Sequence, residues 1–132
     1  MTAYIICGSE SDSWFAKQII QSLSAYNIES EVHYISAHKS PHQVLYLLGE
    51  FANTKKYVII TIAGRSNALS GVVAANTTVP VIACPPFKDN IDMLVNIQST
   101  LQMPSKVPVL TILDPGNCAY SVKRIFDMID RK

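Results

Sequence analysis

Tyr57-Val58-Ile59-Ile60-Thr61-Ile62 is a run of mostly β-branched, apolar residues, and it leads directly into the polar loop Ala63-Gly64-Arg65-Ser66-Asn67. The run predicts a strand buried on both faces. The small residues from Ala68 to Asn76 predict a helix immediately behind the loop, with Ser66 or Asn67 as its cap. This order is typical of an open α/β sheet, in which ligands bind in a crevice at the carboxyl ends of the strands.

The same alternation of strand and helix patterns continues along the whole chain. Strands are expected at 3–7, 31–35, 57–62, 79–84 and 107–113, and helices at 14–26, 41–51, 68–76, 91–101 and 117–129. Strands that alternate with helices imply βαβ units, whose right-handed crossovers place helices on both faces of the sheet. The sequence therefore predicts a single α/β domain over residues 1–132. We expect a three-layer αβα sandwich of flavodoxin-like type with a mostly parallel sheet of about five strands.

The composition narrows the class of protein further. The 132 residues are 48% hydrophobic and 16% charged, with a formal net charge of +1. This balance gives no overall attraction for nucleic acid or for an anionic membrane. No apolar run is long enough to span a bilayer. Cys7, Cys84 and Cys118 are far apart and form no CxxC pair, so reduced thiols in a cytoplasmic protein are expected.

Four polar loops, at 8–12, 36–40, 63–67 and 84–89, fall at the carboxyl ends of the expected strands, and we expect them to meet in one crevice. In the first, the hydroxyls and backbone N–H groups of Gly8-Ser9-Glu10-Ser11-Asp12 suit a phosphate, and Asp12 could accept from ribose hydroxyls. The alternative is a glycine turn followed by helix caps, with Asp12 or Ser13 capping the helix. The spacing matches neither a Walker loop nor GxGxxG, so neither ATP nor NAD is indicated.

The second loop, Ser36-Ala37-His38-Lys39-Ser40-Pro41, carries a histidine that can move a proton near neutral pH and a lysine that can pair with an anion. The alternative is a solvated histidine beside a lysine at the start of a helix, with Ser40 as the N-cap. The spacing of His33, His38 and His42 matches no common zinc pattern, so no metal is predicted.

The third loop resembles GxSxG, but Ala68 stands where the final glycine would be and no histidine follows Ser66. A serine-hydrolase triad is therefore excluded, and Ser66 is interpreted as a binding hydroxyl and helix cap, or as a cap alone. Cys84, which precedes Pro85-Pro86, is interpreted as a buried strand residue rather than a nucleophile.

Five short segments of the chain are weak motifs individually, but their combination is specific. They are Gly8-Ser9-Glu10-Ser11-Asp12, Ser36-Ala37-His38-Lys39, Ala63-Gly64-Arg65-Ser66-Asn67, Pro80-Val81-Ile82-Ala83-Cys84-Pro85-Pro86 and Gln102-Met103-Pro104. In this order they resemble the PurE-type aminoimidazole ribonucleotide carboxylases of purine biosynthesis. The mutases of that family, which act on the N5-carboxylated nucleotide, typically carry SAHR and AGGAAHLPG. Lys39 and Arg65-Ser66-Asn67 instead resemble the class that uses carbon dioxide directly.

The resemblance implies carboxylation of 5-aminoimidazole ribonucleotide at C4 without biotin, ATP or metal, by a homo-oligomer of four or eight chains. It makes His38 the acid/base. The groups implied to bind substrate are Ala63, Gly64, Arg65 and Ser66 at the carboxylate, and Ser9, Ser11, Asp12, Ser36 and Lys39 at the ribose phosphate. The alternatives are the mutase reaction, a non-catalytic nucleotide-binding module and a flavin-binding electron carrier.

Overall fold

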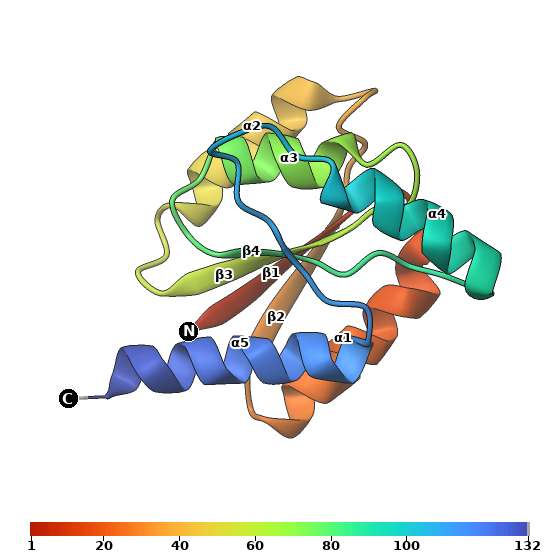
Figure 1. The fold of residues 1–132 in the computed structure, drawn as a ribbon. Helices are drawn as coiled ribbons and strands as arrows, with labels where there is room; N and C mark the ends of the chain where they lie inside the picture. Colours follow the sequence, from red (N-terminus) through yellow and green to blue (C-terminus); the bar gives the residue numbers. More distant parts are fainter. Residues whose placement is uncertain (132) are drawn as a thin grey trace.

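Five parallel strands form one sheet in the order β2-β1-β3-β4-β5 in the computed structural model, which describes residues 1–131 (Figure 1). The strands are β1 (Thr2–Cys7), β2 (Glu29–Tyr34), β3 (Tyr57–Ile62), β4 (Val81–Ala83) and β5 (Leu110–Thr111). The helices are a short 3₁₀ turn η1 (Glu10–Asp12), then α1 (Ser13–Ala25), α2 (Pro41–Phe51), α3 (Ala68–Ala75), α4 (Asn90–Leu101) and α5 (Pro115–Asp130). The predicted flavodoxin-like sandwich is confirmed.

Side-chain alternation along the central strands divides the core between two faces of the sheet. Ile5 of β1 lies beside Ile60 of β3 and faces α1 and α5, whereas Tyr4 lies beside Ile59 and faces α2 and α3. All four are buried, and full burial of an isoleucine side chain stabilises the fold by roughly 1.5–3 kcal/mol. The helices therefore cover both faces, as Figure 1 shows. This packing holds the carboxyl ends of the strands at one edge.

The sequence located the central strand β3 best and the strands β4 and β5 worst. The predicted bounds of β3 are those observed, because its buried residues leave a continuous apolar run. The predicted strand 107–113 is reduced to Leu110–Thr111, an edge strand in which Leu110 is half exposed. Pro108 has no N–H to donate to a ladder, which explains why pairing begins only after it. The predicted strand 79–84 is likewise shortened to Val81–Ala83, between Pro80 and Pro85.

Helix α4 has an inward face that differs from the one its apolar spacing indicated. Leu94, Ile97 and Leu101 recur at a helical spacing within the predicted helix 91–101, a pattern typical of a buried stripe, but Leu94 and Leu101 are 59% and 57% exposed. The buried residues of α4 are Asn96 and Thr100. Its position is therefore set by polar contacts, described below. Among residues 1–131 no helix is both long enough and apolar enough to cross a membrane.

Candidate active site

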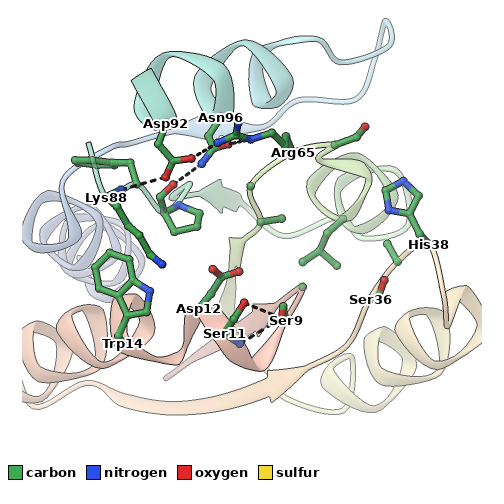
Figure 2. Close-up of a pocket in the computed structure, with 18 residues that line it drawn as sticks. Ser9, Ser11, Asp12, Trp14, Ser36, His38, Arg65, Lys88, Asp92 and Asn96 are labelled. Atoms are coloured by element: carbon green, nitrogen blue, oxygen red, sulfur yellow. Dashed lines mark hydrogen bonds and ion pairs between the residues drawn. The ribbon is translucent and has the colours of Figure 1, made fainter. Parts of the chain in front are cut away.

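The four polar loops meet in one cavity of about 390 Å³ at the carboxyl edge of the sheet (Figure 2). The order of the strands reverses between β1 and β3, so the loops that follow these two strands form the switch point where α/β sheets bind ligands. The lining residues predicted from the sequence are Ser9, Ser11, Asp12, Ser36, His38, Ala63, Gly64, Arg65 and Ser66. The predicted convergence of the loops is confirmed.

The loop after β1 presents two hydroxyls close together. Ser9 Oγ lies 2.9 Å from Ser11 Oγ and also accepts a hydrogen bond from the Ser11 backbone N–H at 3.2 Å, which caps η1. This local bonding fixes the loop as a tight turn before α1. Both serines remain exposed toward the pocket, where their hydroxyls can donate to an anionic ligand.

Asp12 is the acid of this end of the pocket. It occupies the N-cap position of α1 but forms no capping hydrogen bond, so the alternative that assigned its side chain to helix capping is wrong. Burial raises the pKa of the Asp12 carboxyl, and Asp92 raises it further, while Lys88 acts in the opposite direction. A carboxyl that is not used as a cap and is held among other charges is available to accept from a ligand hydroxyl.

The loop after β3 is tied to α4 through buried amide and hydroxyl groups. Asn67, not Ser66, caps α3, because its Oδ1 accepts from the Ser70 N–H at 3.0 Å. The Asn67 Nδ2 group donates to Thr100 Oγ1 at 3.0 Å, and the Asn67 backbone N–H donates to Ser99 Oγ at 2.7 Å. Of the two caps that the sequence allowed, Asn67 is therefore the one observed, and the Ser66 side chain is left at the pocket wall.

Arg65 extends from the same loop and is held by α4. Its Nε donates to Asn96 Oδ1 at 3.1 Å, and its Nη2 forms an ion pair with Asp92 Oδ1 (Figure 2). The guanidinium is half exposed, so its remaining N–H donors can reach a ligand in the pocket.

The loop after β2 carries His38 at the opposite end of the pocket from Trp14 and Lys88 (Figure 2). Its side chain is exposed, and within residues 1–131 the imidazole ring forms no hydrogen bond. Lys39 is not among the lining residues: its N–H donates to Ser36 Oγ at 3.2 Å, and its side chain is exposed. The binding role of Lys39 stays a prediction. Ser40 occupies the N-cap position of α2 without a side-chain capping bond.

Sequence reasoning missed several residues of the pocket wall. They are Trp14, Phe87, Lys88, Asp92 and Asn96. Lys88 lies in the expected loop at 84–89 after β4, where a cation at the carboxyl end of a strand is a signal for an anionic ligand. Asp92 and Asn96 are four residues apart on α4, a spacing that places them on one helix face, and this polar pair is the signal that could have found them.

The three thiols take no part in the site. Cys7, Cys84 and Cys118 are fully buried, as expected for Cys84. Burial raises the pKa of Cys7 to about 12, and a hydrogen bond with Cys118, added to burial, raises the pKa of Cys84. Since the thiolate is the nucleophilic form, Cys7 and Cys84 are poor nucleophiles. Residues 1–131 contain no group of three or more His, Cys, Asp or Glu side chains that could hold a metal ion.

A parallel sheet with strand order 2-1-3-4-5 and a polar pocket at its switch point defines a doubly wound α/β protein built to bind a small polar ligand. The sequence profile of the AIR carboxylase family matches residues 2–132. The chain belongs to this family.

Individual relatives agree with the profile. A phosphoribosylaminoimidazole carboxylase of Archaeoglobus fulgidus is 42% identical over 130 residues, which cover 98% of this chain and 71% of the relative. The crystal structure of Treponema denticola PurE superimposes with a TM-score of 0.90 at 38% identity and covers 98% of this chain and 82% of that one. An N5-carboxyaminoimidazole ribonucleotide mutase of Methanocaldococcus jannaschii is 41% identical over 116 residues, 87% of this chain and 71% of the relative.

Proposed function

We propose that this protein carboxylates 5-aminoimidazole ribonucleotide at C4 with carbon dioxide, yielding 4-carboxy-5-aminoimidazole ribonucleotide for purine synthesis. The observation that carries the proposal is the pocket itself: the proton-transfer group His38 and the donor-rich loop Ala63–Ser66 line the same cavity. Relatives over nearly the whole chain bear the name of this activity. A cytoplasmic location follows from the same assignment.

The proposed chemistry follows from the substrate's enamine-like ring. The C4 carbon attacks carbon dioxide, a C–C bond forms, and the negative charge moves onto the new carboxylate oxygens. Backbone N–H groups of the loop Ala63–Ser66 and the guanidinium of Arg65 stabilise this charge as it develops. His38 then accepts the proton that C4 releases and passes it to solvent, which restores the aromatic ring. Holding both reactants together lowers the entropic part of the barrier.

The other end of the pocket suits the ribose phosphate. The hydroxyls of Ser9 and Ser11 face the cavity, and Asp12 can accept from the ribose hydroxyls. The Lys88 side chain points into the cavity beside Asp12 and Trp14 (Figure 2). We therefore assign the phosphate to Ser9, Ser11 and Lys88. Ser36 and Lys39, expected at the phosphate from the resemblance, retain a supporting role in this proposal.

Arg65-Ser66-Asn67 supports carbon dioxide as the second substrate. A mutase is among the similar proteins, so similarity alone does not choose between the two reactions. The mutase loop typically carries small residues at these positions, whereas here Arg65 brings a cation to the pocket wall. A fixed cation favours the capture of a developing carboxylate from free carbon dioxide.

We also propose that the chain assembles as a homo-oligomer of four or eight copies, as its family resemblance implies. The apolar side chains of α4 support this, because Ile91 is 75% exposed and Leu94 and Leu101 are more than half exposed. Light scattering on the purified protein tests this assembly, and a monomeric mass contradicts it.

The function is tested by incubating the purified protein with aminoimidazole ribonucleotide and bicarbonate in the absence of ATP. We expect the carboxylated product to form at a rate proportional to enzyme, and no yellow flavin colour in the protein. Substrate binding without turnover would instead support a non-catalytic nucleotide-binding module.

A further inference from the structure

Helix α4 carries a row of polar side chains that face the pocket loops. Asp92, Asn96, Ser99 and Thr100 lie along one side of this helix, and each bonds to the loop after β3. Asn96 and Thr100 are also the buried residues of α4. A helix whose buried face is polar is held by specific hydrogen bonds rather than by an apolar stripe, so its contacts can set geometry as well as stability.

Asn96 is the member of this row that joins two loops at once. Its Oδ1 accepts from Arg65 Nε at 3.1 Å, and its Nδ2 donates to the Pro86 carbonyl at 2.6 Å. Its side chain is 3% exposed, so these two bonds satisfy groups that water does not reach. One amide therefore links the loop after β3 to the loop after β4 (Figure 2).

The orientation of the Arg65 guanidinium depends on this amide. The ion pair with Asp92 holds one end of the planar group, while the bond to Asn96 fixes Nε on the other side. Two contacts on different atoms define the plane of a guanidinium, whereas one leaves it free to rotate. Within residues 1–131 no hydrogen bond from Nη1 is formed, so these donors remain available to a ligand.

We propose that Asn96 is a positioning residue of the carboxylation site, which fixes the guanidinium of Arg65 against the carboxylate that forms during the reaction. The inference rests on the proposed function. Asn96 touches no substrate in this account and acts through Arg65 alone. Its loss therefore affects the chemical step, while the Ser9, Ser11 and Lys88 end of the pocket still binds the nucleotide.

A double-mutant cycle tests this directly. The wild type, Asn96→Leu, Arg65→Ala and the double variant are compared for kcat and for KM of aminoimidazole ribonucleotide. We expect Asn96→Leu to lower kcat roughly 10- to 100-fold, as for a misplaced reactive group, with KM changed by less than about twofold. In the Arg65→Ala background the same substitution should lower kcat by less than about twofold, because the group through which it acts is gone.

Two further variants separate positioning from stability. Asn96→Asp keeps an acceptor for Arg65 Nε but places a carboxylate oxygen against the Pro86 carbonyl, so it should lose thermal stability and still retain more kcat than Asn96→Leu. Asn76→Leu is the matched control, because the Asn76 amide also donates to one backbone carbonyl, that of Val72, but lies outside the pocket lining. It should leave kcat unchanged.

The results of these experiments distinguish the positioning role of Asn96 from the proposed function. The positioning role is overturned if the fold-losses in kcat of Asn96→Leu and Arg65→Ala multiply in the double variant. It is also overturned if kcat follows the melting temperature across the Asn96 variants. Neither result affects the proposed function. A wild type that makes no product from carbon dioxide overturns the proposed function and this inference together. If Asn96→Leu does not fold, Asn96→Ser, which removes both bonds without adding bulk, replaces it in the same cycle.

Discussion

The loops after β3 and β2 both line the pocket, but they are held in different ways. The loop after β3 is anchored by Asn67, which is 8% exposed and bonded to both α3 and α4. The loop after β2 carries His38 on an exposed turn, supported by the backbone bond from Ser40 to Ser36 and the bond from Lys39 to Ser36 Oγ. The loop after β3 is held rigidly by buried hydrogen bonds, whereas the loop after β2 presents the proposed acid/base His38 on an exposed turn that contributes little to the fold.

This difference implies that substitutions in the two loops affect stability and activity separately. A change in the anchored loop should first cost stability, because buried polar groups lose their partners. A change at His38 should cost turnover alone. Variants that change activity, and then variants that change stability, test this contrast between the two loops, each group beginning with the largest expected effect.

Replacing His38 with Asn should have the largest effect. The substitution removes the proposed acceptor of the C4 proton, so kcat should fall by about 10²- to 10⁴-fold. The melting temperature should hardly change, because the side chain is exposed. His42→Asn is the matched control, because His42 is also exposed but lies on α2, and this variant should retain full kcat. Wild-type turnover in the His38 variant would remove the acid/base role.

Lysine substitutions locate the phosphate. Lys88→Met should raise KM for the nucleotide about tenfold, the effect of losing one charge-assisted hydrogen bond, with a smaller effect on kcat. Lys39→Met should change KM less, because Lys39 is not among the lining residues. Both are exposed lysines, so each controls for the other. If Lys39→Met has the larger effect on KM, the phosphate lies at the loop after β2, as the family resemblance predicts for Lys39.

Asn67→Ala should destabilise the protein by about 2 kcal/mol. It removes the cap of α3 and leaves the buried Thr100 hydroxyl without its Asn67 donor. Urea unfolding at fixed protein concentration measures the loss. Asn76→Ala, which removes an exposed side-chain bond, should cost less than about 0.5 kcal/mol. Equal losses for the two variants would show that the loop after β3 is not anchored as described.

Asp12→Asn should produce the smallest effect, a pH-dependent gain in stability. Burial raises the pKa of Asp12 in the folded protein above its ordinary value of 3.8, so the folded state binds the proton more tightly than the unfolded state does. The Asp12 contribution to stability is therefore present at low pH and is lost as pH rises from 3.8 through the folded pKa.

At neutral pH the Asn variant should therefore be the more stable protein, and the difference should vanish in acid. Unfolding curves of both proteins from pH 3 to pH 7 measure it. A variant that is less stable than the wild type at neutral pH would contradict the stated cause of the shift. KM for the nucleotide should rise in the same variant, because the substitution removes the carboxylate proposed to accept from the ribose hydroxyls.

The sequence predicted well those features of the structure that depend on neighbouring residues in the chain. The buried run of β3, the strand–helix alternation and the four polar loops followed from pattern, and their meeting point followed from the geometry of parallel sheets. Strands β4 and β5 were predicted too long, because the extent of strand pairing depends on neighbouring strands rather than on residue type alone. The family resemblance predicted that Lys39 lies at the pocket. A resemblance in sequence gives the type of residue at a position but not the direction of its side chain.

The polar face of α4 could not be recognised in the same way. Apolar spacing at Leu94, Ile97 and Leu101 indicated a core-facing stripe, but the inward positions belong to Asn96 and Thr100. Their burial depends on partners in loops 30 or more residues away, such as Arg65 and Asn67. The four-residue spacing of Asp92 and Asn96 places them on one helix face, but it does not identify these distant partners, so the burial of that face could not be predicted from the sequence.

The central claim is that carbon dioxide itself is the second substrate, and an isotope experiment tests it most directly. Purified protein is given unlabelled N5-carboxyaminoimidazole ribonucleotide in buffer containing ¹³C-bicarbonate, and the carboxyl carbon of the product is analysed by mass spectrometry. The account predicts ¹³C in the product, because the nucleotide must first lose its N5-carboxyl group and then be carboxylated from the dissolved pool. Product that retains the unlabelled carboxyl carbon would contradict the account and assign the mutase reaction instead.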